Sequence, residues 1–177
     1  MNKILIILIG LLFSVNSYCQ SADEMYDILD EEYFANGSPE KSMYTYYLFD
    51  YKYEIKGKQN SGKSDGIQVS DIWYMQITNS GNIVFKISFA TNQGSFDILV
   101  NNENVRRQNN KYQYNCVIRH TVTNHGSGGF KEYRYNATLT AFEKLEMLSR
   151  GNIGNTSNIT VKSVDNKTLI DFSNITN

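Results

Sequence analysis

The chain has 177 residues, of which 41% are hydrophobic, and this is enough to bury one sizeable core. Its 17 Lys and Arg residues stand against 18 Asp and Glu residues, so it lacks the cationic excess that nucleic-acid binders use. The densest cationic cluster is Arg106, Arg107 and Lys111, in an Asn-rich turn that we interpret as a solvated loop. We therefore predict no nucleic-acid partner.

The N-terminal residues have the pattern of a secretory signal peptide. Lys3 supplies a basic start, and Ile4–Phe13 is apolar apart from Gly10. Ser17 and Cys19 then occupy the two positions that signal peptidase recognises. The apolar run is shorter than the roughly 20 residues that span a bilayer, and no second long apolar run follows. We therefore predict no transmembrane segment in the mature chain.

This pattern predicts removal of residues 1–19 and leaves residues 20–177 as a single secreted or periplasmic domain. The alternative is a bacterial lipoprotein anchored through Cys19. A lipoprotein signal has Leu three residues before the cysteine and a small residue directly before it. This chain has Asn16 and Tyr18 at those positions, so free export is the favoured prediction.

A helix is predicted near residues 22–34, at the start of the mature domain. Ser21 and Glu24 have the spacing of a capping box, which satisfies free backbone N–H groups at a helix start. The residues expected on its apolar face are Met25, Ile28, Leu29 and Tyr33. The acidic outer face is interpreted as solvated.

A long, tyrosine-rich strand is predicted from residue 42. Its first half is apolar on both faces, whereas its second half alternates and places Asp50, Lys52 and Glu54 outward. A strand that is apolar on both faces needs a cover on its back, and we expect the N-terminal helix to provide it. The alternative is that the tyrosines form a platform on which a ligand stacks.

The rest of the chain has the pattern of antiparallel strands joined by short turns, with a polar loop at residues 57–66. Further strands are predicted at 67–78, 83–90, 96–100, 112–122, 130–139, 159–164 and 168–172. Asn101–Asn104 is expected to end the strand before it, and a capping box at Thr140 predicts a second helix near residues 140–149.

These elements predict an α+β fold that is predominantly antiparallel β. Strands longer than ten residues usually curl, which favours a strongly curved meander sheet or an open barrel. We expect about 7–9 strands, an N-terminal helix and a second helix near 140–149.

Two catalytic letter patterns overlap in the predicted polar loop. Gly57–Ser64 matches a P-loop, which requires a helix to begin at Lys63. Gly62–Gly66 matches a hydrolase nucleophile elbow, which requires a parallel sheet and a strand-to-helix turn. The next residues alternate as a strand, so we predict neither site.

Cys116 and His120 share one face of a predicted strand. Four residues of extended chain separate them by roughly 13 Å, which is too far for both to ligate one zinc ion. Cys116 also has no disulfide partner once Cys19 is removed. We interpret Cys116 as a small buried hydrophobe and His120 as a core or rim histidine, and we predict no metal and no cofactor.

The favoured hypothesis is a non-catalytic secreted or periplasmic binding module, because an export-targeted β domain rich in aromatics lacks an assembled catalytic set. Its ligand would be a glycan, an apolar ligand or an envelope protein met at an exposed sheet edge. The candidate contact residues are Trp73, Tyr44, Tyr46 and Tyr51. The alternative is a small envelope-polymer hydrolase that uses His120 or His125 with a carboxylate.

Overall fold

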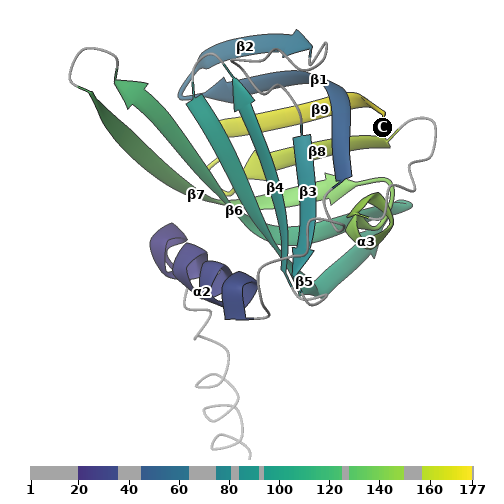
Figure 1. Cartoon of the computed structure of the whole chain (residues 1–177). Coiled ribbons are helices and arrows are strands. Elements are labelled where there is room, and N and C mark those ends of the chain that lie inside the picture. Colours follow the sequence, from purple (N-terminus) through teal and green to yellow (C-terminus); the bar gives the residue numbers. More distant parts are fainter. Residues whose placement is uncertain are drawn as a thin grey trace, which may run out of the picture.

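The computed structural model describes residues 20–35, 45–63, 75–80, 84–91, 94–124, 128–149 and 157–176, and the predicted signal peptide lies outside them. Within these ranges the chain forms one nine-stranded antiparallel sheet and two helices (Figure 1). The helices are α2 (Ala22–Ala35) and α3 (Leu145–Ser149). The strands are β1 (Thr45–Ile55), β2 (Lys58–Lys63), β3 (Met75–Ser80), β4 (Val84–Thr91), β5 (Gly94–Gln108), β6 (Lys111–Asn124), β7 (Gly129–Ala141), β8 (Ser157–Ser163) and β9 (Thr168–Thr176).

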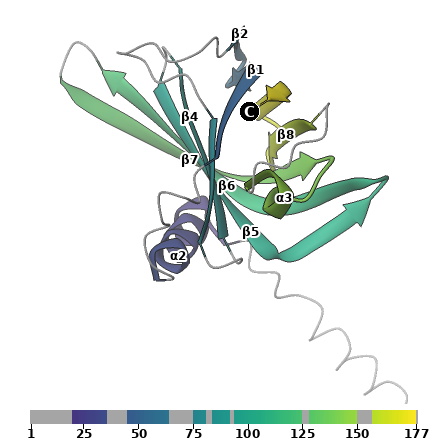
Figure 2. The same ribbon diagram turned by 45° about the vertical axis from the view of Figure 1, so that its right-hand side comes forward.

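The sheet curls until its last strand borders its first. The strands pair in the order β2-β1-β3-β4-β5-β6-β7-β8-β9, and β9 also pairs with β1. Along Asp50–Ile55, β1 lies between β2 and β9, whereas Thr45–Tyr47 pairs with β3. The result is the half-barrel visible in Figures 1 and 2. The predicted α+β class and the strongly curved antiparallel sheet are confirmed.

The inner face of the half-barrel holds the main core. The alternating pattern of β4, β5, β6 and β7 points one set of side chains inward, as predicted for a strand with one buried face. Members of this core include Phe85, Ile87, Phe89, Phe96, Ile98, Val100, Tyr114, Cys116, Ile118, Ala137 and Leu139. Burial of this much apolar surface supplies most of the stabilisation.

The first helix packs on the outer face of the sheet. Its start is the predicted capping box, since Glu24 N–H donates to Ser21 Oγ at 3.2 Å and Ser21 N–H to Glu24 Oε2 at 3.1 Å. The residues that it buries in a second, outer core are Tyr26, Leu29 and Tyr33, together with Val84, Leu99 and Val117 of β4, β5 and β6. The predicted apolar face is therefore partly wrong, because Ile28 is 42% exposed and Tyr26 is buried instead.

The expected position of this helix, over the strand that begins near residue 42, is also wrong. Its main contacts are with β4, β5, β6 and β7, with a smaller contact to β3, and Figure 1 shows it lying against this part of the sheet. The physical reason is that Leu99 and Val117 make the middle of β5 and β6 apolar on both faces, so these strands need a cover.

The second helix is shorter than predicted. Thr140 and Ala141 still belong to β7, and α3 begins only at Leu145. Leu145 and Leu148 are buried in the main core, and Leu145 N–H donates to the Tyr114 hydroxyl at 3.1 Å. The capping box predicted at Thr140 is thus wrong, because pairing with β6 and β8 keeps that residue extended.

Two predicted loop boundaries, the start of the loop at residues 57–66 and the strand end at Asn101–Asn104, are also wrong. In both regions the structure has a two-residue turn between paired strands. Lys56 and Gly57 have positive φ angles of 51° and 77°, so β1 turns directly into β2, where a loop was predicted. Asn109 and Asn110, with φ of 50° and 59°, turn β5 into β6. The predicted strand end at Asn101–Asn104 is instead a register shift inside β5.

Candidate functional site

Two tyrosines of the predicted strand, Tyr51 and Tyr53, have described side chains, and both face the core. Tyr51 is only 5% exposed and stacks on Tyr53 with ring centroids 6.1 Å apart. Burial raises the pKa of the Tyr51 phenol. Tyr46 lies in β1 with its backbone opposite Gln76. The other predicted contact residues, Tyr44 and Trp73, lie outside the described residues.

A run of contacting aromatic rings crosses the interior from β1 to β6. The ring centroids of Tyr53 and Phe96 lie 5.3 Å apart, and the two rings are tilted by 57°. Phe96 stacks on Phe89 with ring centroids 4.6 Å apart and an interplanar angle of 3°. On its other side Phe96 stacks on the His120 ring at 4.2 Å, again at 3°. Such contacts add to the stabilisation from burial, so we expect these rings to keep fixed positions in the interior.

His120 is therefore part of the aromatic interior, with a 7% exposed side chain. Gly94 allows this packing, because a Cβ at that position would lie 3.0 Å from His120 Nε2 and 2.3 Å from the Thr121 carbonyl oxygen. Cys116 is buried on the same strand, and desolvation raises the pKa of its thiol. His125 lies outside the described residues.

Within the described ranges, the residues considered for a metal site and for a phosphate-binding loop do not have the required arrangement. These residues contain no group of three or more His, Cys, Asp or Glu side chains that could hold a metal ion. Lys63 belongs to strand β2 and lies 3.8 Å from an Asp50 carboxylate oxygen. Because Lys63 does not begin a helix, the P-loop pattern has no phosphate-binding geometry here.

A polar groove lies where β2 and β9 flank β1. The register places Lys52 between Ser61 of β2 and Asp171 of β9. It likewise places Glu54 between Gln59 and Leu169. The groove has a volume of about 370 Å³ and is lined by Lys52, Tyr53, Glu54, Gln59, Asn60, Ser61, Leu169 and Asp171.

Hydrogen bonds across the β1–β2 hairpin shape this groove. Gln59 Nε2 donates to Glu54 Oε2 at 2.9 Å, and Asn60 Nδ2 donates to the Tyr53 hydroxyl at 3.1 Å. The lining residues therefore carry one ammonium group, two carboxylates, two amides and two hydroxyls, together with one aliphatic side chain. This mixture of donors and acceptors suits a neutral ligand that carries several hydroxyl groups.

The sequence analysis missed the groove. Lys52 and Glu54 were interpreted as a solvated strand face, which their alternation with tyrosines supports. The signal that could have found them is the matching polar pattern of Asp171 and Ser173 on the last strand. That signal becomes informative only once β9 is known to lie beside β1.

A second polar cluster joins α2 to the outer face of the sheet. Arg119 pairs with Asp97 on β5 and lies 4.0 Å from Glu132 on β7. Arg134 bonds Glu132 at 2.8 Å and Asp27 of α2 at 2.9 Å. The two guanidinium groups lie 5.1 Å and 4.3 Å from the ring centre of Tyr26. Because Tyr26 and Asp27 of α2 contact these groups, we interpret the cluster as a joint between α2 and the sheet rather than as a ligand site.

Neither helix in the described part of the chain has the length and apolar character needed to cross a bilayer. Comparison of the chain with protein-family models, with curated proteins and with solved structures gives no match.

Proposed function

We propose that this protein is a non-catalytic, secreted or periplasmic binding module that holds a hydroxyl-rich ligand, such as a sugar unit of a glycan, in the groove between β2, β1 and β9. The observation that carries the proposal is the 370 Å³ groove itself, with charged and neutral hydrogen-bonding side chains from three adjacent strands. Its volume falls within the range of small-molecule sites.

The aromatic packing behind the groove strengthens this proposal. Tyr53 lines the groove and also packs on Phe96 in the aromatic interior. Its hydroxyl accepts a hydrogen bond from Asn60, which fixes the phenol in place. A site whose side chains are already held in place loses less conformational entropy when a ligand binds.

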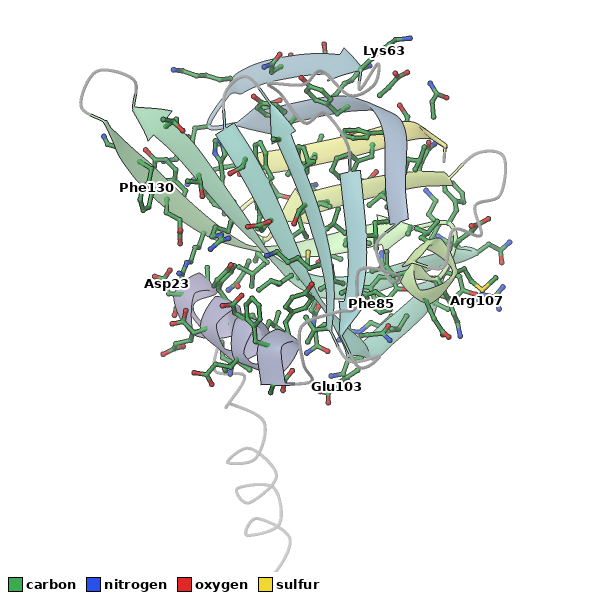
Figure 3. All side chains as sticks on the ribbon, viewed as in Figure 1. Asp23, Lys63, Phe85, Glu103, Arg107 and Phe130 are labelled. Atoms are coloured by element: carbon green, nitrogen blue, oxygen red, sulfur yellow. The ribbon has the colours of Figure 1, made fainter. Side chains whose placement is uncertain are left out.

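The test is isothermal titration of the purified protein with a panel of neutral oligosaccharides. Asp171→Asn and Glu54→Gln are expected to weaken binding at least about tenfold, since each weakens a charge-assisted hydrogen bond. Glu103→Gln is the matched control, because Glu103 is exposed and far from Lys63 at the end of β2 (Figure 3). The absence of saccharide binding, or binding unaffected by the two groove variants, would contradict the proposal.

The same titration separates binding from catalysis. We expect the oligosaccharide to be recovered intact after prolonged incubation with the protein. Release of shorter products would favour the envelope-polymer hydrolase instead. That alternative needs a histidine accessible to its substrate. The His120 ring is buried against Phe96, and His125, the other candidate, lies outside the described residues.

A further inference from the structure

Strand β7 has one side that no described strand covers. It pairs with β6 along its whole length, Gly129–Ala141, but with β8 only along Ala137–Ala141. Figures 1 and 2 show this end of the β6–β7 hairpin projecting away from the other strands. Within the described part of the chain, residues 129–135 are therefore a bare sheet edge.

The direction of the backbone groups on this edge follows from one hydrogen bond. Val164 N–H donates to the Asn136 carbonyl at 2.9 Å, so that carbonyl points away from β6. Backbone groups of alternate residues in an antiparallel strand point the same way. The N–H and C=O groups of Phe130, Glu132 and Arg134 therefore face the uncovered side.

Comparison with the other bare edge shows why β7 is suited to pairing. β2 pairs only with β1 among the described strands, but it is short and carries Lys58 and Lys63 at its ends, a common protection of an edge. The β7 edge keeps an unbroken register with β6 and carries Phe130 with 72% of its surface exposed (Figure 3). It has the regular geometry that a further strand requires.

The charges on this edge are complementary between two copies of the strand that run antiparallel to each other. An antiparallel copy centred on Tyr133 places Glu132 of one chain opposite Arg134 of the other. Registers centred on Glu132 or on Arg134 would instead place like charges opposite each other, which is unfavourable. We propose that two copies of this chain pair through β7, antiparallel, about a two-fold axis at Tyr133.

The charged pairs would extend contacts that already exist within one chain. Arg134 Nε donates to Glu132 Oε1 at 2.8 Å, so both side chains lie on the same face of β7. Across the axis they would form a cluster of two carboxylates and two guanidinium groups. Self-complementarity of this kind favours a second copy over an unrelated partner.

The experiment is sedimentation velocity of the purified protein over a wide concentration range. Glu132→Pro removes one backbone donor on the bare side, and proline is tolerated on strand edges whose N–H faces solvent. The wild-type protein is expected to dimerise, and Glu132→Pro to weaken the dimer at least about tenfold. Glu132→Gln keeps the N–H and is the matched control, with a smaller loss expected.

A second variant tests the register independently of the backbone. Glu132→Arg places Arg opposite Arg134 and is expected to abolish the dimer while the thermal unfolding midpoint stays within a few degrees of the wild-type value. A wild-type protein that stays monomeric at every concentration would overturn the proposal. A dimer that survives both Glu132→Pro and Glu132→Arg would overturn it as well.

Discussion

The two faces of the sheet are stabilised in different ways. On the inner face Ile98, Phe96 and Ile118 pack into a core of apolar and aromatic side chains. On the outer face of the same strands, Leu99 and Val117 form a small apolar patch for α2, and ion pairs of arginine with carboxylates surround it. We therefore expect the inner face to determine whether the protein folds, and the outer face to determine whether α2 stays attached to a sheet that is already formed.

The largest effect is expected at the centre of the aromatic interior. Phe96→Ala removes a ring that packs against Tyr53, Phe89 and His120, and it should lower the free energy of unfolding by about 3–5 kcal/mol. Urea denaturation followed by fluorescence measures this. Phe130→Ala is the control, because its exposed ring should cost less than about 0.5 kcal/mol. Equal losses at the two positions would contradict the importance of the inner face.

A smaller effect is expected in the outer core. Leu29→Ala should cost about 2–3 kcal/mol, since Leu29 is buried between α2 and the sheet. Hydrogen exchange should rise in α2 and change little in β5 and β6, because the helix can detach without unfolding the sheet. Ile28→Ala, at an exposed position of the same helix, is the control. Faster exchange throughout the sheet would show that the two faces are not separable.

A gain in stability of about 1 kcal/mol is expected for Tyr26→Phe. The Tyr26 hydroxyl is buried, and no hydrogen-bond partner for it is found among the described residues. Burial also raises the pKa of this phenol, which stays neutral at physiological pH. Phenylalanine keeps a ring for Arg119 and Arg134 to stack on while removing the desolvated hydroxyl. Thermal unfolding checks this, and a lower midpoint in the variant would show that the hydroxyl is stabilising.

The smallest effect is expected for the exposed ion pair of the joint. Asp27 lies 2.9 Å from Arg134, but its side chain is 66% exposed, so Asp27→Asn should cost no more than about 0.5 kcal/mol. The difference from wild type should disappear in about 1 M salt, where screening acts over roughly 3 Å. Glu31→Gln, also exposed on α2, is the control. An effect that persists at high salt would indicate a role other than charge pairing.

The sequence by itself determined the features that depend on neighbours along the chain. Alternation predicted the strands that became β4, β6 and β7, and the spacing of Ser21 and Glu24 predicted the first helix start. The β6–β7 hairpin also follows from such local pattern. These predictions succeed because the direction of a side chain repeats every two residues in a strand and about every 3.6 residues in a helix, so it depends only on local sequence.

Only the tertiary structure decided which strands lie side by side. The groove exists because β9 returns to β1, where Asn174 Nδ2 donates to Asp50 Oδ2 at 2.7 Å across 124 positions of the sequence. The place of α2 is decided in the same way, by the Arg134–Asp27 contact across 107 positions. No local pattern encodes how far a sheet curls, because curvature accumulates from the twist of every strand and from packing on both faces.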